Sequence, residues 1–122
     1  MARILLIEDD EKFRKMLVLL LSSSGHEVID AEDGKKGMRA FGQSAFDLVI
    51  TDIFMPEQDG LEVVRHLGKQ TGDVKILVIS GGGLEGTFQY LEYAEKFGAD
   101  KTLIKPFENH ELLDAVNTLL ET

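Results

Sequence analysis

The fold is decided by the stretch ILLIEDDE at residues 4–11, where a short apolar run changes abruptly to acidic residues. Four consecutive apolar residues, from Ile4 to Ile7, are typical of a strand that is buried on both faces, as strands of a parallel sheet are. In open parallel α/β sheets, functional groups gather at the carboxyl ends of the strands. The acids that begin at Glu8 therefore mark one edge of the predicted sheet as a candidate site.

The same alternation of elements continues along the rest of the chain. Further apolar runs predict strands, and the segments between them carry apolar residues at helical spacing, with Gly25 and Gly98 placed as helix stops. The predicted strands after the first are Val28–Ala31, Leu48–Ile50, Ile76–Ile79 and Leu103–Ile104. Five strands that alternate with five helices predict an α/β fold, a doubly wound (βα)5 sheet of five parallel strands with helices on both faces.

Length and composition predict one domain over residues 1–122, with no output domain in the chain. A net charge of −9 disfavours direct contact with nucleic acid, and the basic pairs Arg14-Lys15 and Lys35-Lys36 are interpreted as parts of solvated helix faces. The absence of cysteine excludes disulfides and cysteine-bound zinc. The longest apolar run, Met16 to Leu21, is far too short to span a bilayer, so we expect a soluble cytoplasmic protein.

Polar residues follow the other predicted strands at the same edge of the sheet. Asp52 follows the third strand, Ser80 and Gly81 follow the fourth, and Lys105 follows the fifth. Several carboxylates at one site repel each other, and a hard divalent cation that prefers oxygen ligands, such as magnesium, relieves the repulsion. One carboxylate can act as a nucleophile and become an aspartyl phosphate, while the lysine and the serine hydroxyl bind phosphoryl oxygens. The set therefore suits phosphoryl transfer, which needs mainly positioning and charge neutralisation.

Each of these residues also has a structural interpretation when it is taken alone. Asp10 can be a helix N-cap, Asp52 a turn residue and Ser80 a structural hydroxyl. Lys105-Pro106 can simply end a strand. The functional interpretation depends on the coincidence of several such signals at one edge of one sheet.

In order along the chain, these and other motifs resemble the receiver (CheY-like) domain of two-component response regulators. The resemblance covers the whole chain, and the complete set of motifs in this order is highly specific. Beside the opening stretch, the motifs are Gly25–Val28, Ala31–Gly34, Asp52–Pro56 with Gly60, Val78–Gly81, Gly98–Asp100 and Lys105–Phe107. The resemblance implies a flavodoxin-like sheet in the strand order 2-1-3-4-5 and a stand-alone, single-domain regulator.

The resemblance also implies a phosphoacceptor and a metal site. Asp52 would accept the phosphoryl group, with Mg²⁺ or Mn²⁺ as the cofactor. Asp9 would bind the metal directly and Glu8 would bind it through a water molecule. Asp52 and the backbone carbonyl of Phe54 would complete the protein ligands.

Further residues take switch roles by the same resemblance. Ser80 and Gly81 would bind the phosphoryl group together with Lys105, whose peptide bond to Pro106 is expected to be cis. Thr102 stands at the switch position, where the family often has an aromatic residue. We also hypothesise that the bulky Phe54 beside the site slows attack by water and lengthens the lifetime of the phosphorylated form.

The implied partners are proteins. A histidine kinase or a histidine phosphotransfer protein would supply the phosphoryl group. The fourth and fifth helices, with the fifth strand, would form the face that binds an unknown downstream protein, and neither nucleic acid nor a membrane would be a direct partner. The chain would catalyse only its own phosphorylation and dephosphorylation.

Three alternatives remain open from the residues. A phosphohydrolase with an aspartyl nucleophile commonly carries a second Asp two positions later, where this chain has Phe54. A flavin-binding domain needs a hydroxyl- and glycine-rich phosphate cradle after the first strand, where residues 8–11 are all acidic. A pseudo-receiver would keep the fold and never be phosphorylated, and the complete set of acids, serine and lysine argues against it.

Overall fold

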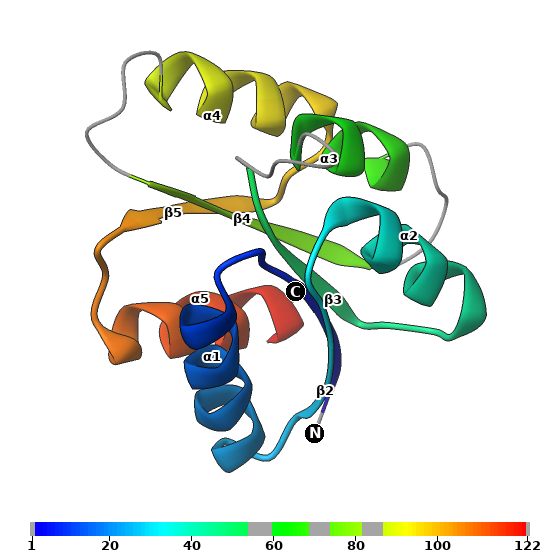
Figure 1. Cartoon of the computed structure of the whole chain (residues 1–122). Coiled ribbons are helices and arrows are strands. Elements are labelled where there is room, and N and C mark those ends of the chain that lie inside the picture. Colours follow the sequence, from blue (N-terminus) through cyan, green and yellow to red (C-terminus); the bar gives the residue numbers. More distant parts are fainter. Residues whose placement is uncertain (1, 54–59, 69–73, 82–86, 122) are drawn as a thin grey trace.

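The computed structural model describes residues 2–53, 60–68, 74–81 and 87–121. Five parallel strands form one sheet in the order β2-β1-β3-β4-β5, and a helix follows each strand along the chain (Figure 1). The strands are β1 Arg3–Ile7, β2 Glu27–Ala31, β3 Leu48–Asp52, β4 Lys75–Gly81 and β5 Lys101–Lys105. The helices are α1 Glu11–Ser23, α2 Gly34–Gln43, α3 Gly60–Gly68, α4 Thr87–Phe97 and α5 Asn109–Glu121. The predicted α/β fold and its strand order are confirmed.

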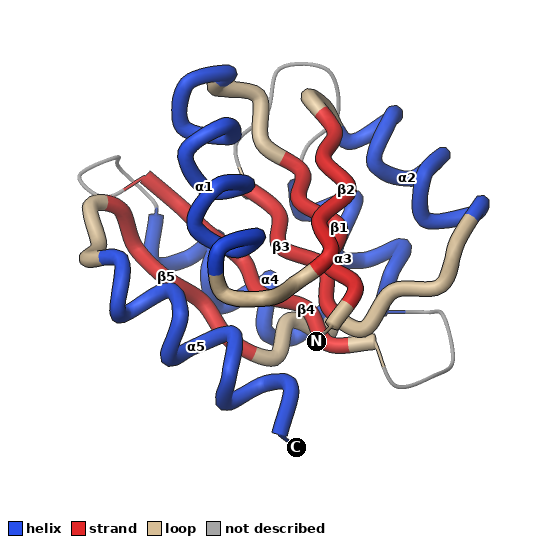
Figure 2. Tube along the Cα trace, turned by 90° about the horizontal axis from the view of Figure 1, so that it is seen from below, coloured by secondary structure: helices blue, strands red, loops and turns tan. Residues whose placement is uncertain are grey.

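The sheet separates two apolar layers. Leu5 and Ile7 of β1 belong to one cluster with residues of α2, α3 and α4, whereas Ile4 and Leu6 belong to a second cluster with residues of α1 and α5. Figure 1 shows these two groups of helices on opposite sides of the sheet, and Figure 2 views the molecule from the side of α1 and α5. Because helices cover both faces of the sheet, successive residues of a central strand are all buried, whichever face they point to. This burial explains the continuous apolar runs in the sequence.

Three helix ends follow from single residues. The Asp10 carboxylate accepts a hydrogen bond from the Phe13 amide at 3.1 Å, so the structural interpretation of Asp10 as an N-cap is confirmed. Gly25 and Gly98 follow α1 and α4 with φ angles of +92° and +124°. This left-handed region favours glycine, and both helices end where the sequence predicted. The cap at Asp10 places the beginning of α1 beside the carboxyl end of β1.

Helix α2 approaches β1 closely at one glycine. A Cβ atom added at Gly37 would lie 2.4 Å from Cδ1 of Ile7, a distance that real side chains do not adopt. Ile7 is the last residue of β1 and is fully buried, so it has little room to move away. Gly37 therefore sets how closely α2 covers the end of the strand that leads into Glu8.

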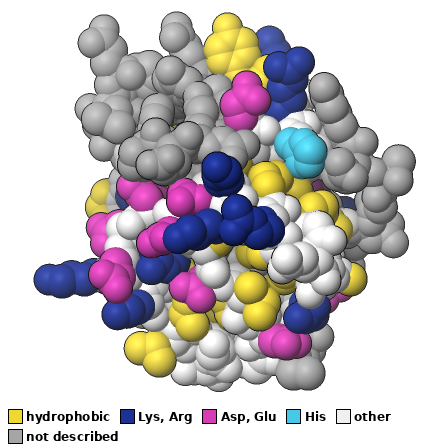
Figure 3. Space-filling view, turned by 45° about the vertical axis from the view of Figure 1, so that its right-hand side comes forward, with side chains coloured by type: hydrophobic (Ala, Val, Ile, Leu, Met, Phe, Trp, Pro, Cys, Tyr) yellow, Lys and Arg dark blue, Asp and Glu magenta, His cyan; other side chains and the backbone are white. Residues whose placement is uncertain are grey.

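Charged side chains of both signs share the described surface. On the face in Figure 3, Lys and Arg side chains near the centre are flanked by Asp and Glu side chains. With a net charge of −9 for the chain, the described part of this face offers no continuous basic surface to a phosphate backbone. Among the helices that the structure describes, none is both long and apolar enough to cross a membrane.

Candidate functional site

Three carboxylates meet at the carboxyl ends of β1 and β3. Glu8 and Asp9 directly follow β1, and Asp52 is the last residue of the adjacent strand β3. One carboxylate oxygen from each of the three residues lies within 4.8 Å of the other two. Glu8 and Asp52 are buried, with exposed fractions of 2% and 6%, whereas Asp9 is exposed. The meeting was predicted from the sequence, because the carboxyl ends of parallel strands lie at one edge of the sheet.

Lys105, the last residue of β5, brings an ammonium group to these carboxylates. Its Nζ donates to Oδ2 of Asp52 at 2.7 Å and to Oε1 of Glu8 at 3.0 Å. Burial alone would lower the pKa of Lys105, but the hydrogen bond and the charge of Asp52, and then those of Glu8, outweigh burial and raise the pKa. The peptide bond between Lys105 and Pro106 is cis, as the resemblance implied.

The Glu8 carboxylate is the most perturbed acid of the cluster. Burial and then the charge of Asp52 raise its pKa to about 7, although the Asp10 amide and the Lys105 ammonium lower it. Both carboxylate oxygens are occupied, since Oε1 accepts from Lys105 and Oε2 accepts from the Asp10 amide at 3.1 Å. The cluster therefore keeps an excess of negative charge that a single lysine does not offset.

The donor set fits a hard divalent cation. Glu8, Asp9 and Asp52 offer only oxygen atoms, which Mg²⁺ and Mn²⁺ prefer, and they offer them from a site with unbalanced negative charge. Asp9 is the member of the cluster that is exposed to solvent. The backbone carbonyl of Phe54, the fourth predicted ligand, lies outside the described residues.

Ser80 carries a buried hydroxyl group at the carboxyl end of β4. It lies in β4, the strand next to β3, one residue beyond the pair formed by Ile79 and Asp52. The residue is 0% exposed, and its Oγ has no partner among the described residues. A buried hydroxyl that is left unpaired costs free energy, so this group is available to donate to an oxygen atom that arrives at the site.

The remaining predicted residues lie on β4 and β5. Gly81 ends β4 and pairs in register with Lys105, so the main chain of both strands reaches the same edge. Thr102 is half-buried in β5 and pairs with Val78, which lies two residues before Ser80 and thus nearer the middle of the sheet.

Arg14 was interpreted from the sequence as part of a solvated helix face, and this interpretation is wrong. The Arg14 side chain is only 12% exposed, and its Nη1 donates to the carbonyl oxygen of Glu8 at 2.9 Å. Its Nε donates to Oδ2 of Asp30 in β2 at the same distance. Arg14 therefore ties the acidic loop to the neighbouring strand. The basic pair in the sequence carried no signal of this difference, since Lys15 beside Arg14 is 71% exposed and makes an i,i+4 ion pair with Glu11.

Phe13 is a second residue at the site that sequence reasoning missed. Its ring centroid lies 4.5 Å from Nζ of Lys105 and 6.0 Å from the centroid of the Phe107 ring, which it meets edge to face. In the sequence, Phe13 is one of the apolar residues at helical spacing in the first predicted helix, and that spacing indicates only a core position.

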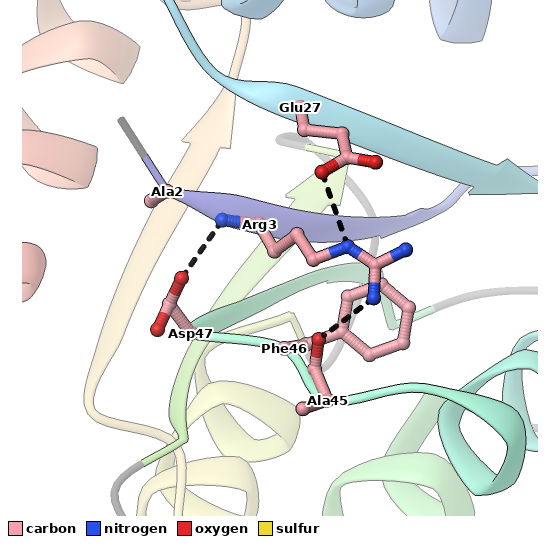
Figure 4. Close-up of a pocket in the computed structure, with 6 residues that line it drawn as sticks. All are labelled: Ala2, Arg3, Glu27, Ala45, Phe46 and Asp47. Atoms are coloured by element: carbon pink, nitrogen blue, oxygen red, sulfur yellow. Dashed lines mark hydrogen bonds and ion pairs between the residues drawn. The ribbon is translucent and has the colours of Figure 1, made fainter.

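A separate pocket lies at the opposite ends of the strands. It has a volume of about 350 Å³ and is lined by Arg3 at the beginning of β1 together with residues at the start of β2 and before β3 (Figure 4). Arg3 Nε pairs with Glu27 at 3.2 Å, Nη1 donates to the Ala45 carbonyl at 3.2 Å, and the backbone amide donates to Asp47 at 2.8 Å. The guanidinium also lies over the ring of Phe46. These groups satisfy one another, so the pocket is a junction of β1, β2 and the segment before β3 rather than a second candidate site.

Comparisons with known proteins agree with this geometry. The family model described as the response regulator receiver domain matches residues 4–117. The response regulator receiver protein CpdR of Brucella abortus is 33% identical, and the match covers 98% of each chain. Other curated relatives are named as transcriptional regulatory proteins, and the chain spans about half or about a quarter of their length.

Solved structures that resemble this chain include response regulators and their receiver domains. A response regulator receiver domain protein from Clostridium thermocellum superposes with a TM-score of 0.90 at 30% identity, over 99% of this chain and 95% of that one. TrrA, a response regulator from Thermotoga maritima solved in complex with Mg²⁺ and BeF, has a TM-score of 0.85 at 33% identity, over 98% and 99% of the two chains. With a matching strand order, a matching family model and a site at the expected edge, the chain belongs to the family of response regulator receiver domains of two-component signalling.

Proposed function

We propose that this receiver domain takes its phosphoryl group on Asp52, and that the modification switches its binding to a downstream protein. One observation carries the assignment of the residue. The Asp52 carboxylate is buried at a strand end, within hydrogen-bond distance of the Lys105 ammonium and one strand away from the unpaired hydroxyl of Ser80. An oxygen nucleophile, a cation for the transferred group and a hydroxyl donor thus lie at the same edge of the sheet, which supports phosphoryl transfer.

The proposed step is an in-line displacement at phosphorus. A carboxylate oxygen of Asp52 forms a new bond to the phosphorus of a phosphohistidine on a histidine kinase or a histidine phosphotransfer protein. The bond from phosphorus to the imidazole nitrogen breaks, its electron pair stays on the nitrogen, and the histidine is released. Lys105 would pair with the oxygens of the transferred group, and Ser80 and the amide of Gly81 would donate hydrogen bonds to them.

We propose Glu8, Asp9 and Asp52 as the residues that hold Mg²⁺, or Mn²⁺ in its place. Asp9 and Asp52 would bind the ion directly, Glu8 would bind it through water, and the carbonyl of Phe54 would complete the set. The ion supplies positive charge that shields the incoming phosphoryl group from three acids. The excess negative charge of the cluster supports this assignment, and so does the complex of the similar regulator TrrA with Mg²⁺ and BeF.

The binding face for a downstream protein is proposed on α4, β5 and α5. Tyr93 and Phe97 of α4 stack on one another while 52% and 40% exposed, and Ile104 of β5 is 38% exposed. Exposed aromatic and aliphatic side chains of this kind favour a protein partner. Thr102, in the same strand as Ile104, is the proposed switch position between the site and this face.

The proposal also covers catalysis, cellular location and contact with nucleic acid. The domain would act as a signal transducer that catalyses only its own phosphorylation and dephosphorylation, because position 54 offers a Phe where an aspartyl phosphohydrolase has an acid. The lack of cysteine supports a cytoplasmic location, and the acidic surface argues against direct contact with nucleic acid. A single receiver domain over residues 1–122 stays a prediction from the sequence.

The test is intact-mass analysis after incubation with acetyl phosphate and magnesium. We expect the wild type to gain one phosphoryl group, and Asp52→Asn or a sample with a chelator to gain none. Asp114→Asn is the matched control, because Asp114 is an exposed acid on α5, and it should be phosphorylated like the wild type. Phosphorylation that persists in Asp52→Asn would show that another carboxylate is the acceptor. Folded wild type that binds Mg²⁺ but gains no group would favour a pseudo-receiver.

A further inference from the structure

Besides the carboxylates of Glu8 and Asp52, the ammonium group of Lys105 contacts an uncharged aromatic ring that cannot bind a metal ion. We propose that Phe13 is a positioning residue whose ring holds the Lys105 ammonium at the phosphoryl site while the carboxylate partners of the lysine change. The inference rests on the proposed function, because it concerns the step in which Asp52 accepts a phosphoryl group. The observation behind it is the 4.5 Å distance from Nζ of Lys105 to the centroid of the Phe13 ring.

The Phe13 ring is itself held in place from two sides. The backbone amide of Phe13 donates to the N-cap carboxylate of Asp10 at 3.1 Å, which ties the residue to the first turn of α1. The Phe107 ring meets the Phe13 ring edge to face, with an interplanar angle of 62°. The hydrogen bond fixes the main chain at Phe13 and the Phe107 contact restricts the ring, so little of the ring has to be ordered when it faces the lysine.

The position of the ammonium group makes the contact effective. The Lys105 side chain is 27% exposed, so most of it is shielded from water, and shielding strengthens the attraction between a cation and the negative face of a ring. The four methylene groups of lysine allow many conformers, and an amine that leaves the site for solvent must be ordered again before it can bind an anion. The ring restricts this motion.

The two anionic partners of Lys105 are the groups that the proposed reaction occupies. In the proposed reaction Asp52 becomes an acyl phosphate, and Glu8 belongs to the metal cluster, so both carboxylates change their contacts. Phe13 has no atom that can bind a metal ion or accept a phosphoryl group. Its contact with the ammonium group therefore persists while the other two are exchanged, and its contribution is largest when the site is loaded.

A role in packing alone makes a different prediction. Phe13 is half-buried and lies against the apolar layer of α1 and α5, so its loss reduces stability whatever it does for Lys105. Packing alone requires only an apolar side chain of similar size, whereas positioning of a cation requires an aromatic ring. The variants Phe13→Leu, Phe13→Tyr and Phe13→Trp separate the two roles. The control is Phe41→Leu, because Phe41 is a partly buried ring that stacks on Phe46 in the other apolar layer.

The first measurement uses the metal-free protein and NMR of the lysine side chains. A ring face close to Nζ shifts the signals of the Lys105 ε-methylene and ammonium protons upfield. We expect Phe13→Leu to remove this shift, and Phe13→Tyr, Phe13→Trp and Phe41→Leu to keep it. Lys105 signals that are the same in the wild type and in Phe13→Leu would overturn the inference, because they would mean that the contact does not form in solution.

The second measurement is the affinity for beryllofluoride, a phosphoryl analogue, in the presence of Mg²⁺. We expect the affinity to fall about fivefold in Phe13→Leu, because a partly shielded cation–π contact provides a factor of this size. In Phe13→Tyr, Phe13→Trp and Phe41→Leu the affinity should stay within about twofold of the wild type. Unchanged affinity in Phe13→Leu, or equal losses in all three Phe13 variants, would refute positioning by the ring. If the wild type itself does not bind beryllofluoride, the proposed function fails, whereas the NMR result still decides whether the contact exists.

Discussion

The strongest electrostatic perturbation in the described structure leads to a prediction about pH and stability. The pKa of Glu8 is raised to about 7 in the folded chain, chiefly by burial and then by the charge of Asp52, from an ordinary value of 4.5. The folded state therefore binds the Glu8 proton more tightly than the unfolded chain does. The contribution of Glu8 to stability is complete below pH 4.5 and is lost as the pH rises through 7.

The difference between the two pKa values sets the size of the effect. It corresponds to about 3 kcal/mol of stability lost by the metal-free protein between about pH 4.5 and pH 8. Lys105, whose pKa is also raised, contributes to pH dependence only around and above its ordinary value of 10.5, which lies outside this window. Other groups that titrate in the window are common to the wild type and to Glu8→Gln, so the difference between the two proteins isolates Glu8.

The assay is urea unfolding with a chelator at several pH values from 5 to 8. We expect the stability of the wild type to fall relative to that of Glu8→Gln by about 2–3 kcal/mol across this range. Saturating Mg²⁺ should recover stability at pH 8 in the wild type, because the ion binds the ionised form of the folded protein. Parallel stability profiles for the two proteins would refute the reasoning, since they would show that Glu8 is already ionised at pH 5.

Three further predictions concern neighbouring residues. Arg14→Met leaves the Glu8 carbonyl without the Arg14 donor and should lower the free energy of unfolding in urea by about 1–3 kcal/mol, whereas Lys15→Met should change it little. Equal effects of the two substitutions would contradict the assigned role of Arg14. Gly37→Ala should lower the free energy of unfolding by about 1–3 kcal/mol in the same assay because the new Cβ clashes with Ile7, whereas Gly42→Ala, with open space at its Cβ position, should be neutral or stabilising. A Gly37→Ala variant as stable as the wild type would argue against close packing of α2 on β1. Ser80→Ala removes a hydroxyl that has no partner among the described residues, so calorimetry should find the unphosphorylated variant at least as stable as the wild type, while titration should show that the variant binds beryllofluoride more weakly. A marked loss of stability in the variant would mean that the hydroxyl has a partner in solution.

Much of the candidate site could be predicted because its residues follow directly from the ends of strands. Glu8, Asp52, Ser80 and Lys105 lie at or beside the ends of neighbouring strands, and parallel strands bring their carboxyl ends to one edge whatever the details of packing. Local sequence signals were equally reliable where a single residue determines the backbone conformation at the end of a helix. Gly25 ends α1 through its positive φ, which the sequence predicted without any tertiary contact.

The contacts of α1 with the site could not be predicted in the same way. Arg14 and Lys15 are adjacent basic residues on one helix, yet Arg14 is mostly buried against Glu8 and Asp30 while Lys15 is mostly exposed. Their difference depends on how the helix is rotated against the sheet. Helical spacing places Phe13 on an apolar face but does not reveal which charged group lies above its ring.

By itself, the sequence determined the alternation of strands and helices, the parallel sheet, and the edge at which acids, hydroxyl and lysine collect, because these depend on the periodicity of apolar residues and on the order of elements along the chain. Only the tertiary structure decided which carboxylate is most perturbed, which basic residue supports the acidic loop, and which ring lies beneath Lys105. These properties depend on burial and on distances of a few ångströms between side chains from elements far apart in the chain. Such distances are set by the packing of α1 and β5 onto a common core, which no local pattern encodes.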